Sequence, residues 1–127
     1  MSADKLIYLI CAEATERYSL AKYFQKHQFN CQVFDGLPSG RDGVTAKSPD
    51  LIVLAGSSLP SPDICKFGAF VEQHGESPII ALLTQLQMSI VSEMAESENL
   101  WTAEYPISLR EIRASVNEAL EELEAEE

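Results

Sequence analysis

The sequence predicts an α/β protein built on a doubly wound sheet of five parallel strands. Three observations lead to this prediction. Short apolar runs recur along the chain, segments with helical spacing alternate with them, and the connections between the two are only a few residues long. This alternation is typical of one open sheet with right-handed crossovers, for which the strand order 2-1-3-4-5 is the natural choice.

The segment 49–58 is predicted to contain the central strand. Five consecutive apolar residues, Leu51 to Ala55, follow a Pro-Asp pair and stop before Gly-Ser-Ser. A run this short is typical of a parallel strand that is covered on both faces. Because binding crevices in open α/β sheets lie just beyond the carboxyl ends of the strands, Ala55 and the residues after it should lie at the site.

Four other segments are predicted to complete the sheet. Residues 5–11 and 77–84 are continuously apolar and predict two more buried strands. Residues 29–35 alternate apolar and polar side chains, which is typical of an edge strand. Residues 100–103 predict a brief fifth strand.

Apolar residues at helical spacing follow each strand and predict helices over residues 12–28, 61–75 and 86–98. The segment 37–48 contains a proline and two glycines, so its helix is expected to be short and poorly held. The residues expected to face inward are Leu20 and Phe24 with Tyr23 or His27, then Ile64 and Phe67 with Phe70 or Val71, then Ile90, Val91 and Met94.

The last helix is the best defined. Ser108 is predicted to cap it, with Glu111 three residues later completing a capping box. The predicted apolar stripe consists of Leu109, Ile112, Val116, Leu120 and Leu123. The stripe is interpreted as core packing, except that Leu123 lies beyond the expected end of the sheet and could contact a second copy or a linker. The glutamates that crowd the end of this helix oppose its dipole, so fraying is expected there.

The length of 127 residues fits one domain. We assign residues 1–120 to the domain and residues 121–127 to an acidic helical tail or the start of a linker to further chain. No apolar run is long enough to cross a bilayer and no signal peptide is evident, so a cytoplasmic location is expected. The cysteines are Cys11, Cys31 and Cys65, which show no metal-ligand spacing and are expected to be reduced thiols.

The net charge of -11 is unevenly distributed. Residues 1–50 hold six basic and six acidic residues, whereas residues 51–127 hold three basic and fourteen acidic ones. Nucleic acid and anionic membranes both require a positive surface, so neither is expected as a partner. A protein partner with a basic surface, or solubility alone, would explain the excess.

The chain resembles the receiver domain of bacterial response regulators over nearly its whole length. The motifs that carry the resemblance are Pro-Asp-Leu-Ile-Val-Leu before Ala55, Ser-Pro-Ile-Ile at residues 77–80, and Pro-Ile-Ser-Leu-Arg-Glu at residues 106–111. The resemblance implies a phosphorylated aspartate after the third strand and a cis peptide bond before Pro106. It also implies an aromatic switch residue, whose position falls on Thr102, beside Trp101.

The residues that carry the family's chemistry are missing. By this resemblance, the two acids that bind magnesium correspond to Cys11 and Ala12, the phosphorylated aspartate to Ala55, the hydroxyl residue to Leu83 and the lysine to Tyr105. A thiol and a methyl group do not supply the oxygen ligands that Mg²⁺ requires. Phosphoryl transfer also needs a nucleophile and positive charge, so no metal, cofactor or enzymatic activity is expected.

Neighbouring side chains could restore part of the site. Glu13 and Thr84 each lie one residue beyond a missing group, and Asp63 follows the central strand. Asp50 begins the same strand as Ala55, about 16 Å away, and should lie at the opposite edge of the sheet. None of these residues replaces the lysine.

We therefore interpret the chain as a pseudo-receiver, a receiver-like domain that is not phosphorylated and binds protein partners in bacterial signalling. The family's partner surface, on the fourth and fifth helices and the fifth strand, would comprise Ser89, Glu93, Glu96, Trp101, Glu104 and Arg113. A homodimer is a further alternative, for which Leu123 would supply a contact. Trp101 could instead be partly buried and serve only to pack against the last helix.

A second hypothesis is a flavodoxin-like sensor of a small molecule, or an enzyme. It would use an emptied crevice near Ala12, Ala55 and Tyr105, whose loss of charge suits an uncharged ligand. His27 and His74 are isolated, and the glycines do not form a phosphate-binding loop, so neither supports catalysis.

Overall fold

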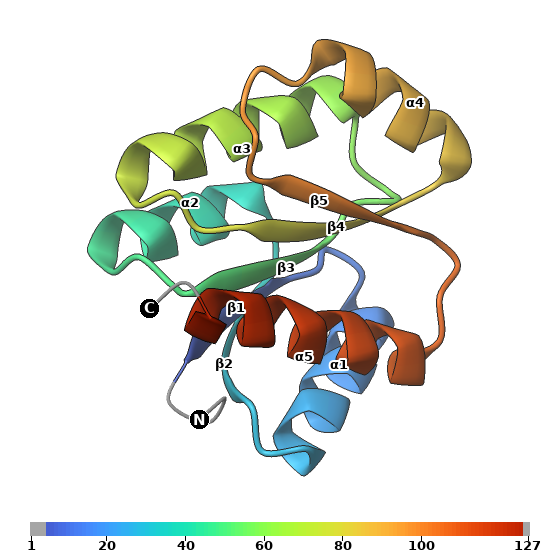
Figure 1. Cartoon of the computed structure of the whole chain (residues 1–127). Helices are drawn as coiled ribbons and strands as arrows, with labels where there is room; N and C mark the ends of the chain where they lie inside the picture. The colour runs from blue at the N-terminus through green and yellow to red at the C-terminus, as the bar shows by residue number, and fades with distance from the viewer. Residues whose placement is uncertain (1–4, 126–127) are drawn as a thin grey trace.

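A computed structural model describes residues 5–125 as alternating strands and helices (Figure 1). The elements in order are β1 (Leu6–Ile10), α1 (Ala14–Lys26), β2 (Asn30–Phe34), α2 (Leu37–Ala46), β3 (Leu51–Ala55), α3 (Ser61–His74), β4 (Ile79–Leu83), α4 (Gln85–Met94), β5 (Leu100–Glu104) and α5 (Leu109–Ala125). Every strand and helix predicted from the sequence is present.

The five strands form one parallel sheet in the order β2-β1-β3-β4-β5, as predicted. The three central strands are buried along their whole length, whereas β2 and β5 at the edges are only partly buried. This difference follows the sequence, because continuous apolar runs can be covered on both faces and mixed runs cannot.

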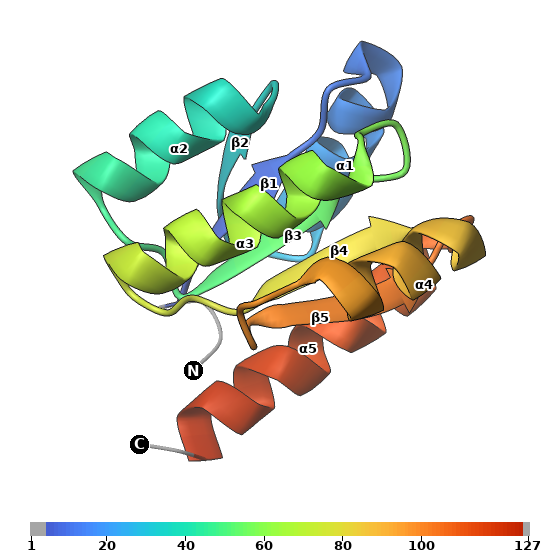
Figure 2. The ribbon, with the colours of Figure 1, turned by 90° about the horizontal axis from the view of Figure 1, so that it is seen from above.

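Helices cover both faces of the sheet. Helices α1 and α5 lie on one face, and α2, α3 and α4 lie on the other (Figures 1 and 2). Because side chains alternate along a strand, Ala55 packs in the layer of α1 and α5, and Leu83 packs in the layer of α2, α3 and α4. The two residues thus close the same edge of the sheet from opposite sides.

Helix α2 is held more firmly than its composition predicted. Its Leu37 and Val44 are buried, and the hydroxyl of Tyr8 donates to the carbonyl of Lys47 at 2.6 Å. A methyl group at Gly40 would lie 2.6 Å from Cδ1 of Ile10, so the glycine allows the helix to approach the sheet closely. The expectation of a poorly held helix was wrong, because Gly40 allows close packing against the sheet and does not interrupt the helix.

Helix α4 ends at Met94, earlier than predicted. Of the three residues expected to face inward, Val91 is buried, Ile90 is half-buried and Met94 is 45% exposed. Only one side of this short helix therefore contributes to the core.

Helix α5 follows its predicted pattern. The hydroxyl of Ser108 accepts a hydrogen bond from the Glu111 amide at 3.1 Å, and Ile112, Val116 and Leu120 are buried. Leu109 and Leu123 pack at the margin of the same core. Residues 126–127, which belong to the predicted acidic tail, lie outside the described residues. None of the helices in the described part of the chain is long and apolar enough to cross a membrane.

Candidate functional site

The carboxyl ends of β1, β3 and β4 meet at one edge of the sheet. The strand register places Ile10 beside Leu54 and Ala55 beside Leu82. The amide of Tyr105 donates to the carbonyl of Leu83 at 2.7 Å, which brings the end of β5 to the same edge. The positions singled out from the sequence therefore lie on neighbouring strands or directly after them.

The centre of this edge is sealed by apolar packing. Cys11 is 1% exposed, Ala55 is 5% exposed and Leu83 is 0% exposed. Leu83 lies so close to the backbone that a methyl group at Gly56 would be only 2.7 Å from its Cδ2. No crevice exposes Ala55, although Ala12 is exposed and Tyr105 is half-buried.

Cys11 is a protonated thiol within this edge. Its Sγ donates to Oε1 of Glu16 at 3.3 Å and lies 3.5 Å from the carbonyl oxygen of Glu13. Burial, then the hydrogen bond and the negative charge of Glu16, raise the pKa of Cys11 to about 12. A neutral thiol is neither a nucleophile nor a ligand for Mg²⁺.

A guanidinium group lies in the loop where the family carries its acidic pair. Nη1 of Arg17 donates to the carbonyl of Cys11 at 3.1 Å and to the carbonyl of Ala12 at 3.3 Å. Glu13 caps α1, since its carboxylate accepts from the amides of Thr15 at 2.6 Å and Glu16 at 3.2 Å. The carboxylate of Glu13 is therefore engaged with the first turn of α1.

Gln87 joins two loops at this edge, a role that the sequence analysis missed. Its Nε2 donates to the carbonyls of Gly56 at 2.8 Å and Leu59 at 2.9 Å, after β3. Its Oε1 accepts from the Thr84 amide at 2.9 Å, and its own amide donates to Oγ1 of Thr84 at 3.2 Å. The Thr84-x-x-Gln87 pattern could have predicted the capping box, but not the link to the β3–α3 loop.

The remaining acids do not rebuild a metal site. Asp50 accepts from the amide of Leu6 at 2.7 Å, which places it at the opposite edge of the sheet, as predicted. Asp63 lies in the first turn of α3 and is half-buried. Within residues 5–125, no group of three or more His, Cys, Asp and Glu side chains is arranged to hold a metal ion.

Comparison with known structures identifies the fold. A CheY-like response regulator receiver domain protein from Methanospirillum hungatei JF-1 aligns with a TM-score of 0.80 over 97% of this chain and 98% of its own, at 15% identity. A response regulator receiver protein from Sinorhizobium medicae WSM419 aligns with a TM-score of 0.77 over 94% of this chain and 96% of its own, at 13% identity. The fold is that of a receiver domain.

Likeness at this level of identity establishes the receiver fold alone. A structure titled as an adenylate cyclase from Rhodopirellula baltica also aligns, with a TM-score of 0.81 over 95% of this chain and 90% of its own, at 12% identity. No family model matches the sequence, and no curated protein matches it either. The bond between Tyr105 and Pro106 is cis, as the resemblance implied.

The residues suggested as a partner surface divide into two groups. Ser89, Glu93 and Glu96 are exposed on or just after α4, and Glu104 is exposed on the neighbouring strand β5. On the same strand, Thr102 is exposed and Trp101 is half-buried against the core beneath α5.

Arg113 does not join this surface. Its Nη1 lies 2.8 Å from Nδ1 and 3.0 Å from Nε2 of His27, and its guanidinium is 5.9 Å from the ring centre of Tyr23 on α1. Partial burial, then the positive charges of Arg113 and Lys26, lower the pKa of His27. Arg113 therefore belongs to the contact between α1 and α5.

Proposed function

We propose that this chain is a pseudo-receiver, a receiver-fold domain that works without phosphorylation and binds protein partners in bacterial signalling. One observation carries the proposal: the methyl group of Ala55 ends β3, where the family has its nucleophile, and it is only 5% exposed, within the core cluster that also contains Cys11. We assign no enzymatic activity and no cofactor to the domain, and place it in the cytoplasm. We assign residues 1–120 to the receiver-like domain and residues 121–127 to an acidic helical tail or the start of a linker.

The chemistry of the edge supports this proposal. Phosphoryl transfer requires an in-line nucleophile, a metal ion and positive charge on the transferred group. Cys11 is held protonated, Leu83 is apolar, and Tyr105 stands where the family has lysine. Arg17 carries a positive charge, but it donates to backbone carbonyls of its own loop.

The link made by Gln87 fits a domain with no covalent switch. Such a domain needs its binding surface in place at all times. Gln87 ties the loop after β3 to the first turn of α4, so the start of that helix is positioned without any phosphoryl group. The proposed partner surface comprises Ser89, Glu93, Glu96, Trp101 and Glu104, and its acidic character favours a basic protein partner.

Treatment with acetyl phosphate and Mg²⁺, followed by intact mass measurement, tests the proposal. We expect no mass increase corresponding to a phosphoryl group, because Ala55 has no nucleophilic atom and the carboxylate of Glu13 is engaged in capping α1. An ordinary receiver domain that retains its aspartate and lysine, treated in parallel, serves as the positive control. A stable phosphoryl adduct on this chain would overturn the proposal.

A further inference from the structure

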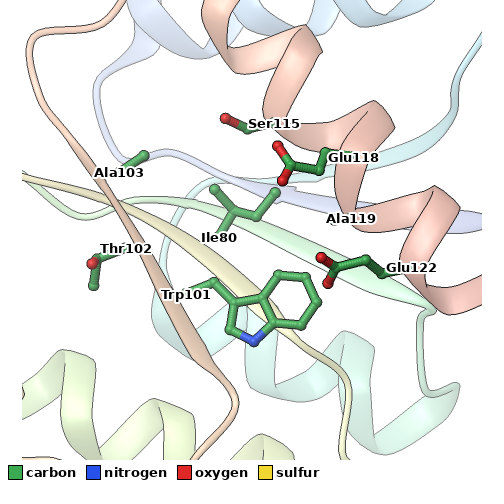
Figure 3. Close-up of a pocket in the computed structure, with 8 residues that line it drawn as sticks. All are labelled: Ile80, Trp101, Thr102, Ala103, Ser115, Glu118, Ala119 and Glu122. Carbon is green, nitrogen blue, oxygen red and sulfur yellow. The ribbon is translucent and has the colours of Figure 1, made fainter.

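Trp101 lies between two adjoining hollows near the amino end of β5. The first hollow, of about 210 Å³, lies between β5 and α5, where the indole of Trp101 and the side chains of Glu118 and Glu122 line the same space (Figure 3). The second, of about 300 Å³, shares Trp101 and Glu122 with the first and continues to Glu72, Glu76 and Glu98. We call these six residues the tryptophan groove.

The charge of the tryptophan groove is uncompensated. Neither hollow is lined by a lysine, arginine or histidine. Glu118 and Glu122 are one turn apart on α5, and neither has an ion-pair partner within residues 5–125. They also lie near the negative end of the helix dipole, in a helix whose last turn has no basic residue. A bound cation would relieve this repulsion.

A second observation at the floor also points to a donor from outside. Asn99 lines the second hollow and is only 7% exposed. Its Nδ2 donates to the carbonyls of Gly68 and Ser77, both at 3.1 Å, whereas its buried Oδ1 has no hydrogen-bond partner. Buried acceptors in native proteins are normally paired, so the residues beneath the second hollow hold an unused acceptor, which a ligand donor would reach only after the side chains that cover it moved.

The indole determines which cation fits best. A half-exposed tryptophan face attracts cations through its ring quadrupole, and surrounding carboxylates strengthen the attraction. Arginine combines permanent charge, a flat surface that stacks on aromatic rings, and several donors for carboxylates. A lysine ammonium supplies the charge without the stacking.

We propose that the tryptophan groove binds an arginine-bearing segment of a partner protein, with a guanidinium group stacked on Trp101 between Glu118 and Glu122. This inference rests on the proposed function and names the chemistry of its partner. It also moves the centre of binding from α4 to the side of β5 that faces α5.

Trp101 is the only tryptophan in the chain, so its fluorescence reports on the groove directly. Titration with an arginine–glycine octapeptide is expected to produce a saturable fluorescence change. The same peptide with citrulline in place of arginine keeps the shape and loses the charge, and should produce none. Glu118→Gln with Glu122→Gln should weaken peptide binding about tenfold, since both carboxylates contact the cation.

A second charge-neutralised pair controls for the overall acidity of the chain. Asp35→Asn with Asp42→Asn removes the same charge from exposed positions just before and on α2, outside the proposed partner surface, and should change the affinity by less than about twofold. Equal weakening by both pairs would overturn the proposal, because binding would then follow net charge alone. No fluorescence change at millimolar peptide, or an equal response to the citrulline peptide, would also overturn it.

Sedimentation of the free protein tests a rival occupant. Dimerisation that depends on concentration and is abolished by Glu118→Gln with Glu122→Gln would overturn the proposal in favour of a second copy of the chain. A monomer at all concentrations, together with peptide binding, supports it. These outcomes are separable from the phosphorylation test, since a phosphoryl adduct would refute the pseudo-receiver while leaving the measured peptide affinity unchanged.

Discussion

The carboxyl edge of the sheet and the tryptophan groove differ in how far their polar side chains are paired. At the carboxyl edge, Ala55 and Leu83 are buried and the polar side chains are paired: Glu13 caps a helix, Arg17 binds carbonyls and Gln87 joins two loops. The centre of this edge is therefore packed as part of the hydrophobic core.

At the tryptophan groove, by contrast, several polar groups lack an ion-pair or hydrogen-bond partner among the described residues. Glu118 and Glu122 line a hollow with an aromatic ring and have no cationic partner within residues 5–125, and in the same part of the chain Oδ1 of Asn99 is buried without a donor. The exposed carboxylates of Glu118 and Glu122 are therefore the groups available to a partner. The difference teaches that the receiver fold does not by itself locate the functional surface of this chain.

The largest effect on stability is expected from Ala55→Asp, which places a carboxylate in the buried carboxyl edge of the sheet. At pH 8 the buried carboxylate would lack a cationic partner, so we expect a loss of about 3 kcal/mol in the free energy of unfolding, measured with urea. Burial raises the pKa of such a carboxyl, so the loss should shrink at pH 5, where the group is protonated. Ala55→Asn has the same shape without the charge and should lose less at pH 8. Equal stability of the two variants at pH 8, with Mg²⁺ raising the melting temperature of the aspartate form, would show that the edge can still hold a metal.

Gln87→Leu should loosen the same edge. The carbonyl of Leu59 and the amide of Thr84 would lose their side-chain partner and the carbonyl of Gly56 one of its two donors, so we expect a destabilisation of about 2 kcal/mol. Hydrogen exchange at the Leu59 amide, which donates to Gly56, should quicken. The matched control is Gln85→Leu, at an exposed site in the same turn, which should change stability by less than about 0.5 kcal/mol. Similar losses in both variants would contradict a specific link between the loops.

Glu122→Gln should stabilise the protein by about 0.5 kcal/mol, because it removes like charge from the negative end of α5. Glu111→Gln, in the first turn of the same helix, should destabilise it by a similar amount. Urea unfolding measures both changes, which should diminish at high salt. The same sign for the two substitutions would mean that the groove carries no electrostatic strain.

His27→Gln should produce the smallest effect, visible only in the pH dependence. The pKa of His27 is lowered in the folded protein, so its contribution to stability is complete above the ordinary value near pH 6.5 and is lost as the pH falls through the lower folded value. We therefore expect the free energy of unfolding of the native chain to fall more between pH 7 and about pH 5.5 than that of the glutamine variant. A proton NMR titration that gave His27 an ordinary pKa would contradict this.

Most of the fold was predictable because its determinants are local. Continuous apolar runs mark β1, β3 and β4, and the Ser108 and Glu111 pair marks the start of α5. Two local predictions were wrong in part. Helix α4 ends at Met94, and the glycines of α2 bring it close to the sheet where composition indicated weakness. The end of α4 and the packing of α2 both depend on which neighbours their residues contact, and the spacing of apolar residues along a helix does not specify those neighbours.

The sequence by itself determined the βα alternation and the residue types that stand at the ends of the strands, since apolar periodicity and residue identity can be read position by position. Only the tertiary structure decided which groups those residues contact. Gln87 reaches the carbonyl of Gly56 across 31 residues of chain, and Trp101 lines one hollow together with Glu72 and Glu122 from two other elements. Such contacts arise from strand register and helix packing, which bring distant segments together and leave no periodic pattern along the chain.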